Sequence, residues 1–210
     1  MLIWINGPFG GGKTHTAHEL HRRLPGSIVC DPEEVGFGLH RMLPRPLRAD
    51  FQDLASWRAG VVEVLDRAAR GHDGPILVPM TVVDDQYFAE TVGRLRELGH
   101  PLLHVSLLAR RETVLRRLRE RGLGMALRGL TGNGWVSRVE SFAVQNLDRC
   151  LDQLQRPEFA TQIWTDDVAL PAVADRIGEL AGLTLRPNTD SAPRAALRRA
   201  AVGLRHVRVL

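Results

Sequence analysis

The segment GPFGGGKT, from Gly7 to Thr14, follows the apolar run Leu2–Ile5 and opens a helical pattern that extends to Leu24. It fits the pattern G-x-x-x-x-G-K-[ST] at every fixed position. Glycines let such a loop curl so that its N–H groups face one anion, and the following helix adds the positive end of its dipole. Strand, loop and helix occur in the order that this motif requires, so a glycine-rich turn that binds nothing is the weaker interpretation. The predicted nucleotide contacts are Gly7, Pro8, Phe9, Gly10, Gly11, Gly12, Lys13 and Thr14.

Lys13 is the one lysine in a chain that has 28 lysines and arginines together. Elsewhere the sequence uses arginine wherever it needs a cation. A compact ammonium on a flexible stem bridges β- and γ-phosphates as a point charge, whereas a planar guanidinium does not fit there. We therefore assign a catalytic role to Lys13, and we expect the hydroxyl group of Thr14 to coordinate Mg²⁺.

Short apolar runs alternate with helical patterns along the chain. This alternation predicts an α/β fold of three layers, the P-loop NTPase fold, with a mainly parallel five-stranded sheet and a nucleoside-kinase-like layout. Residues 1–185 form the predicted kinase-like domain, and residues 186–210 form a tail. We expect strands at 2–5, 28–30, 75–80, 102–108 and 162–165, and helices at 13–24, 53–70, 85–98, 111–121, 136–154 and 171–181.

The positive charge of the chain belongs to the tail. Residues 186–210 hold six arginines and one acid, a net of +5, whereas the whole chain carries +4, so the first 185 residues sum to −1. A basic catalytic domain is therefore not indicated, and we expect no nucleic-acid partner. No apolar run reaches the ~20 residues that cross a bilayer. Two cysteines without metal spacing, and a first segment without a basic leader, indicate a cytoplasmic protein.

The third predicted strand ends in Pro79-Met80-Thr81, without the carboxylate that holds Mg²⁺ in many ATPases and GTPases. Asp84 and Asp85 follow later and could cap the next helix. Asp31, at the end of the second strand, is the acid in a suitable place. There it could accept the proton of an acceptor hydroxyl during phosphoryl transfer, as in small-molecule P-loop kinases. Capping the helix that begins at Pro32 is an equally strong interpretation of Asp31, and the two roles are compatible.

A glycine-rich stretch, Gly122 to Gly134, follows a helix that ends in arginines. Arg117 and Arg121 share one helix face and predict a lid, over about residues 116–137, that neutralises phosphate charge in the transition state. A solvated basic face is the alternative.

Aromatic and basic residues in the segment between the second and third strands suggest the acceptor site. Phe51 and Trp57 could stack on a base, and Arg58 could bind a phosphate, although a core role is at least as strong for Trp57. Asp31 belongs to the same predicted acceptor site.

The pattern from Ala192 to Leu210 predicts a basic amphipathic C-terminal helix. One face carries Leu197, Ala200, Ala201, Leu204 and Val207, and arginines surround the other. Such a helix could lie on an anionic membrane surface or dock on the protein's own core; the latter is slightly favoured, because the apolar face is rich in alanine.

The assembled motifs resemble the tunicamycin-resistance ATP-binding protein family over nearly the whole chain. The similarity rests on Ile3–Gly7, Glu19–Leu24, Asp31–Glu33, Asp50–Gln52, Trp57–Ala59, Val78–Thr81, Gly93–Arg96, Arg117–Arg119 and the basic tail, and it is lost around Gly122–Trp135.

The resemblance implies that the nucleotide is ATP, with Mg²⁺, and that the chain protects against tunicamycin, a uridine-containing nucleoside antibiotic. It also implies peripheral membrane contact through the tail. The kinase-like layout favours ATP-dependent phosphorylation of a hydroxyl group of tunicamycin or a related nucleoside-sugar. The rival hypothesis is a nucleotide-binding protein that sequesters the drug unmodified. A regulatory NTPase switch is disfavoured, because the third strand lacks the acid at its end.

Overall fold

A parallel sheet of five strands forms the centre of the protein. The computed structural model describes residues 1–127, 144–159 and 161–205, with backbone only for residues 121–127, 192 and 203–205. The strands are β1 (Leu2–Asn6), β2 (Ile28–Val29), β3 (Ile76–Pro79), β4 (Leu102–Leu108) and β5 (Gln162–Trp164). Their order is β2-β3-β1-β4-β5, and every neighbouring pair is parallel. The predicted α/β class and the five parallel strands are confirmed.

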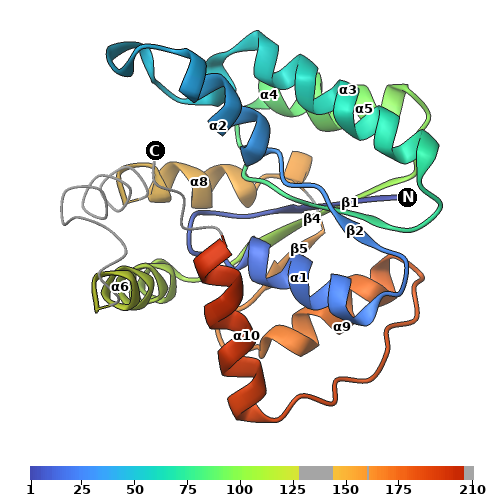
Figure 1. Cartoon of the computed structure of the whole chain (residues 1–210), viewed down its shortest axis with the longest axis vertical. Helices are drawn as coiled ribbons and strands as arrows, with labels where there is room; N and C mark the ends of the chain where they lie inside the picture. Colours follow the sequence, from blue (N-terminus) through green and yellow to red (C-terminus); the bar gives the residue numbers. More distant parts are fainter. Residues whose placement is uncertain (128–143, 160, 206–210) are drawn as a thin grey trace.

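Two hydrophobic clusters fill the two faces of the sheet (Figure 1). On one face, Ile3 and Ile5 of β1 pack against α1 (Lys13–Arg23) and α9 (Leu170–Leu180). On the other face, Leu2 and Trp4 pack against α3 (Ala55–Gly71) and α5 (Arg94–Glu97). β1 is buried on both faces, which explains why its sequence is a continuous apolar run rather than an alternating one.

Three further helices lie around these layers. α2 (Glu33–Met42) follows β2, and a short 3₁₀ turn, Phe51–Asp53, comes just before α3. α8 (Leu147–Leu154) is the described part of the helix predicted at 136–154. The helix predicted at 85–98 is α4 (Asp85–Phe88), a π-helical segment Ala89–Gly93, and α5 in direct succession. The sequence gives no indication of the π segment.

The helix predicted to end at Arg121 is longer in the structure. α6 spans Arg111–Leu127 and runs through Gly122 and Gly124, so the predicted start of the glycine-rich excursion is wrong. A single glycine costs a helix only about 1 kcal/mol, and the leucine, methionine and alanine beside these two favour helix. Of the predicted lid, residues 128–137 lie outside the described residues.

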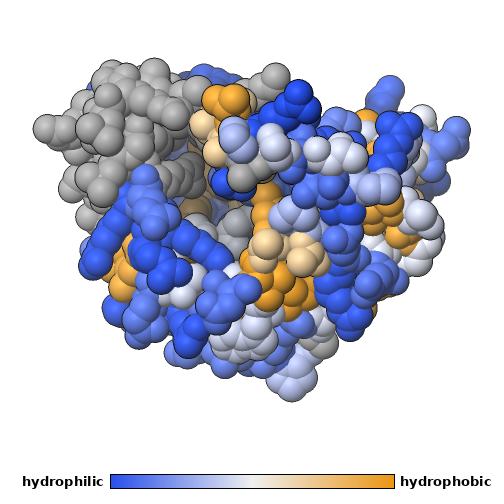
Figure 2. Space-filling view, turned by 90° about the horizontal axis from the view of Figure 1, so that it is seen from below, coloured by the Kyte–Doolittle hydropathy of each residue, from blue (hydrophilic) through white to orange (hydrophobic). Residues whose placement is uncertain are grey.

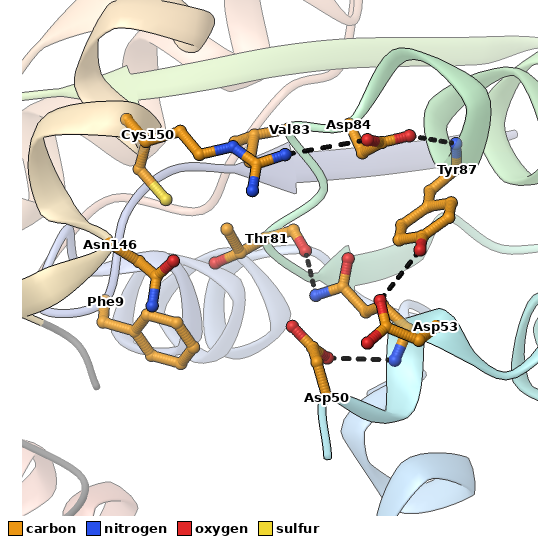
Figure 3. Close-up of a pocket in the computed structure, with 11 residues that line it drawn as sticks. Phe9, Asp50, Asp53, Thr81, Val83, Asp84, Tyr87, Asn146 and Cys150 are labelled. Atoms are coloured by element: carbon orange, nitrogen blue, oxygen red, sulfur yellow. Dashed lines mark hydrogen bonds and ion pairs between the residues drawn. The ribbon is translucent and has the colours of Figure 1, made fainter.

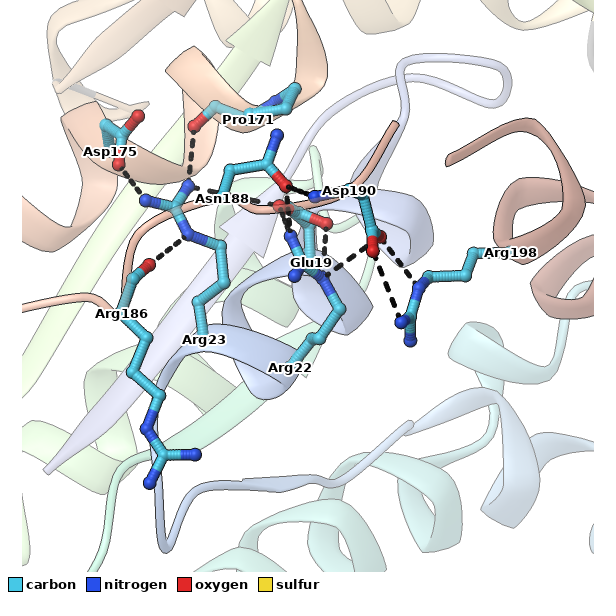
Figure 4. A network of polar contacts seen from close by, with 9 residues as sticks. All are labelled: Glu19, Arg22, Arg23, Pro171, Asp175, Arg186, Asn188, Asp190 and Arg198. Atoms are coloured by element: carbon cyan, nitrogen blue, oxygen red, sulfur yellow. Dashed lines mark hydrogen bonds and ion pairs between the residues drawn. The ribbon is translucent and has the colours of Figure 1, made fainter. Parts of the chain in front are cut away.

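The chain after α9 returns to α1 and is bound there by polar contacts (Figure 4). The Arg23 guanidinium, 4% exposed as a residue, donates to the carbonyl oxygens of Arg186 (2.7 Å) and Pro171 (3.2 Å) and pairs with Asp175. The Arg186 N–H donates to the Arg23 carbonyl in return, at 2.9 Å. The connection between α9 and α10 is therefore fixed to the end of α1.

The tail forms α10 (Ala192–Arg205), which lies against α1 (Figure 1). Asp190 pairs with Arg198 of α10 at 2.7 Å and with Arg22 of α1 at 3.8 Å. Docking on the protein itself is thus observed, but not through the face predicted from the sequence: Leu197 is 71% exposed. Polar contacts of Asp190 and of the helix backbone determine which face of this alanine-rich helix lies against the protein.

Hydrophilic side chains cover most of the side of the molecule seen in Figure 2, with small hydrophobic patches between them. None of the described helices combines the length and apolarity needed to span a membrane.

The Arg23 contacts predict a large stability difference between two arginines. Arg23→Ala should lower the free energy of unfolding by about 2 to 3 kcal/mol, because hydrogen bonds from a buried charged donor are lost. Arg176→Ala on α9 is the control; Arg176 makes an exposed ion pair with Glu179 at 3.1 Å, and its loss should cost below about 1 kcal/mol. Urea unfolding followed by circular dichroism measures both. Equal losses would contradict a structural role for Arg23.

Candidate active site

Asn6, at the end of β1, fixes the start of the glycine-rich loop. Its buried side-chain oxygen accepts hydrogen bonds from the N–H groups of Gly7 (2.9 Å) and Val82 (3.1 Å), and its amide nitrogen donates to the Val82 carbonyl (2.7 Å). The Thr81 hydroxyl group donates to the Gly7 carbonyl at 2.7 Å. The loop is therefore tied to the carboxyl end of β3 by two side chains.

The loop has the backbone that a phosphate site needs. Gly10 and Gly12 have φ values of 77° and 93°, in the left-handed region that side chains other than glycine disfavour. A Cβ atom at Gly11 would lie 2.9 Å from the Pro8 carbonyl oxygen. α1 begins at Lys13 without a side-chain cap and without an acid in its first turn. Its N-terminal N–H groups therefore suit an anion such as a nucleotide phosphate.

Lys13 is 7% exposed and folds over the loop. Its ammonium group donates to the Pro8 carbonyl at 3.1 Å and lies 5.5 Å from the centre of the Phe9 ring. Thr14 follows in the first turn of α1 and is partly exposed. Among the described residues, no group of three or more histidines, cysteines or acids forms a metal site.

A cavity of ≈ 160 Å³ opens beside the loop (Figure 3). Figure 3 shows Asn146, just before α8, and Cys150 of α8 on one side, Asp50 and Asp53 on the other, and Thr81 between them. A cavity of about 150 Å³ holds a single six-membered ring. Its described lining residues are Phe9, Asp50, Gln52, Asp53, Thr81, Val83, Asp84, Tyr87, Asn146, Arg149 and Cys150.

Asp50 and Cys150 connect this cavity electrostatically to the phosphate loop. Burial raises the pKa of the Asp50 carboxyl above its ordinary value, and a hydrogen bond from the Gln52 N–H opposes the shift. Burial also raises the pKa of the Cys150 thiol, while the charge of Lys13 lowers it and that of Asp50 raises it. One wall of the cavity thus lies within electrostatic reach of both Lys13 and Asp50.

The structure corrects the predicted acceptor contacts of Phe51 and Trp57. Trp57 is 0% exposed, packs in the core beside β3 and donates its indole N–H to the Pro32 carbonyl at 3.0 Å. The Phe51 ring packs against Trp57, 5.4 Å between ring centres, and against Phe37. Trp57 is therefore a core residue, as its alternative interpretation held, whereas Phe51 is partly buried and packs over it.

Arg58 is also placed differently from the prediction, because it binds the protein rather than facing the cavity. It is 7% exposed, donates to the Gln52 carbonyl and pairs with Glu90 in the π segment. Its guanidinium group lies 4.5 Å from the centre of the Tyr87 ring. Arg58 therefore holds the residues that line the cavity and is itself already paired.

Asp31 and Asp84 both contact helix starts. The Asp31 carboxylate accepts the Glu33 N–H at 3.0 Å, so the predicted capping interaction is present. The Asp84 carboxylate accepts the N–H groups of Gln86 (3.0 Å) and Tyr87 (3.1 Å) and caps α4. Of these two acids, Asp84 is among the described residues that line the cavity.

Arg117, of the two predicted lid arginines, is bound to the end of β5. Its guanidinium group donates to the Thr165 hydroxyl (3.1 Å) and carbonyl (2.6 Å) oxygens. Burial lowers its pKa from the ordinary arginine value. Arg121 lies on α6, but its side chain is outside the description. α6 also contacts the phosphate loop, because a Cβ at Gly10 would lie 3.0 Å from the Leu118 side chain.

Several residues of the site were not predicted from the sequence. Asn6 precedes the motif and Thr81 ends β3, so their positions at strand ends were the available indication. Tyr87 and Arg149 carried no local pattern, since the cavity brings α4 and α8 together from distant parts of the chain.

Comparison with known proteins agrees with this geometry. A family model described as an AAA domain matches residues 2–126. No curated protein matches the chain. The tunicamycin resistance protein of Deinococcus radiodurans is 34% identical, with 89% of this chain and 99% of that chain covered and a TM-score of 0.69. The resemblance predicted from the sequence motifs is confirmed.

More distant solved structures share the fold alone. A sugar kinase from Janibacter sp. is 18% identical, with 87% of this chain and 95% of that chain covered and a TM-score of 0.59. The APS kinase of Mycobacterium tuberculosis, in complex with AMPPNP and APS, is also 18% identical, with 86% and 96% covered and a TM-score of 0.54. The three-layer, P-loop kinase-like fold predicted from the sequence is confirmed.

The confined position of Lys13 predicts that its exact chemistry is required for nucleotide binding. Lys13→Arg should weaken Mg·ATP binding at least about tenfold, because a guanidinium group is too large for the space and loses a charge-assisted contact. Arg94→Lys, the reverse exchange at a half-exposed ion pair, is the control and should leave the affinity unchanged. Isothermal titration calorimetry measures both variants. An unchanged Kd for Lys13→Arg would refute the requirement.

Proposed function

This chain belongs to the AAA domain family and to the same family as the Deinococcus tunicamycin resistance protein, and we propose that it is a cytoplasmic, ATP-dependent phosphotransferase. Its acceptor is a hydroxyl group of tunicamycin or a related nucleoside-sugar. The observation that carries the proposal is the ≈ 160 Å³ polar cavity beside a phosphate loop whose lysine lies within electrostatic reach of its wall.

The reaction joins the acceptor oxygen to the γ-phosphorus of ATP. The bond from that phosphorus to the β–γ bridging oxygen breaks, ADP leaves, and the acceptor proton passes to a carboxylate. The N–H groups of the loop and Lys13 neutralise the phosphate oxygens. Thr14 would hold Mg²⁺, which would supply further positive charge. Arg117 and Arg121 are the proposed sources of charge neutralisation from α6.

Two carboxylates are candidates for the proton acceptor. Asp31 was expected from the sequence, and its bond to the Glu33 N–H supports a role at the start of α2. Asp50 lines the cavity, and burial raises its pKa, which moves it toward the value that suits a general base near neutral pH. These two observations favour Asp50.

The rival function is sequestration, in which the chain binds the drug and leaves it unmodified. Both functions use the same cavity, so mass spectrometry of the drug separates them. After incubation of the purified chain with Mg·ATP and tunicamycin, phosphotransfer yields drug that is heavier by one phosphate. Unmodified drug that co-purifies with the chain would instead support sequestration. Lys13→Arg is the control that should abolish the modified product.

The candidate bases predict different effects of two matched substitutions. Asp50→Asn should lower kcat by roughly 10²- to 10⁴-fold, the usual contribution of a general base. In the wild type, kcat should fall as the pH drops through the raised pKa of Asp50, and this acidic limb should vanish in Asp50→Asn. Asp31→Asn should retain most of kcat and most of the stability, since an asparagine still accepts the Glu33 N–H and caps a helix about as well as an aspartate. A large loss of kcat in Asp31→Asn, with little loss in Asp50→Asn, would instead identify Asp31 as the base.

A further inference from the structure

The cavity wall carries more negative than positive charge among its described residues. Asp50, Asp53 and Asp84 contribute carboxylates, and Arg149 contributes the cation. Arg149 pairs with Asp84 at 3.7 Å, which leaves two carboxylates on the opposite wall. Bringing an anionic ligand beside them costs Coulomb energy in a partly buried site.

The remaining polar groups of the wall are neutral. Gln52, Tyr87 and Asn146 supply amide and phenol groups, and Thr81 supplies its carbonyl oxygen, which accepts from the Gln52 amide at 3.0 Å. Carboxylates and carbonyl oxygens accept hydrogen bonds from hydroxyl groups, whereas a phosphate offers further acceptors and needs donors. The chemistry of this wall therefore matches hydroxyl groups better than phosphates.

Arg58 is not available in the cavity to bind a phosphate group of an acceptor. It is the arginine that the sequence predicted to bind such a phosphate, yet its contacts go to the Gln52 carbonyl, to Glu90 and to the Tyr87 ring. Arg58 holds the pKa of the Glu90 carboxyl below its ordinary value. The guanidinium group thus acts inside the wall, as a positioning residue.

The carboxylates of the wall are held in place. The Tyr87 hydroxyl donates to the Asp53 carboxylate at 2.8 Å, which raises the pKa of Tyr87. The Gln52 N–H donates to the Asp50 carboxylate at 2.9 Å. Their oxygens therefore face the cavity in a fixed arrangement that a ring with several hydroxyl groups can match.

We propose that this cavity binds an uncharged, hydroxyl-rich ring, of the size of one sugar, and discriminates against an acceptor that carries a phosphate. This assignment rests on the proposed function for the acceptor side of the site and adds its substrate class.

Equilibrium binding tests this selectivity without any phosphoryl transfer. Uridine and uridine 5′-monophosphate are a matched pair of probes that differ by one phosphate. The full chain, saturated with Mg²⁺ and a non-hydrolysable ATP analogue, is titrated with each. We expect uridine to bind at least about tenfold more tightly than the monophosphate. Equal affinities, tighter binding of the monophosphate, or no binding of either probe would overturn the proposal.

Asp53→Asn tests whether the wall carries the selectivity. The asparagine oxygen still accepts from the Tyr87 hydroxyl, so the shape is kept while one negative charge is lost. The preference for uridine over the monophosphate should shrink severalfold in this variant. Asp152→Asn, an exposed acid on α8, removes the same charge outside the cavity and should leave the preference unchanged. An unchanged preference in Asp53→Asn would overturn the assignment.

The result of this binding test can be distinguished from the result of the mass-spectrometric test of phosphotransfer. Uridine selectivity without any phosphorylated product in the mass spectrum would retain the cavity assignment and refute the phosphotransferase. A phosphorylated product without the selectivity would do the reverse.

Discussion

The site depends on one side-chain amide, that of Asn6. Buried at the end of the central strand, it bonds the first N–H of the phosphate loop and both backbone groups of Val82. Leaving a buried amide without partners costs more free energy than its hydrogen bonds contribute when they form. These partners are therefore held in one geometry. Both the nucleotide side and the acceptor side of the site begin at this point. A parallel sheet brings its strand ends to one edge, and Asn6 fixes how two of them meet.

The cavity wall is held by contacts that lie behind it. Trp57 and Phe51 pack beneath the segment that carries Asp50 and Asp53, and Arg58 ties that segment to the π segment through Glu90. A π segment adds one residue to a turn and rotates the helix after it. The π segment comes directly before α5, which packs in the core. It also contains Glu90, which pairs with Arg58.

The fold and the phosphate loop could be predicted from the sequence because their determinants are local. The strand–loop–helix context of Gly7–Thr14 and the apolar runs required no knowledge of distant contacts. The acceptor side could not be predicted, because one sequence pattern fits two environments. An aromatic residue and an arginine beside a ligand site look the same as a core tryptophan and a buried ion pair. Burial of Trp57 and pairing of Arg58 with Glu90 depend on residues far along the chain.

The contacts of the tail are a second feature that the sequence does not predict. Counting charges separates residues 186–210 from the rest, yet their contacts join them to α1. Arg23 bonds the backbone of Arg186, Arg22 and Arg198 share Asp190, and the His15 ring contacts the Arg199 carbonyl at 3.3 Å. His15 lies two residues after Lys13, in the first turn of the helix that ends the phosphate loop. A displacement of α10 must therefore either break these contacts or move α1, the helix whose N-terminus lies at the phosphate loop. The described part of the tail therefore belongs mechanically to the nucleotide-binding layer.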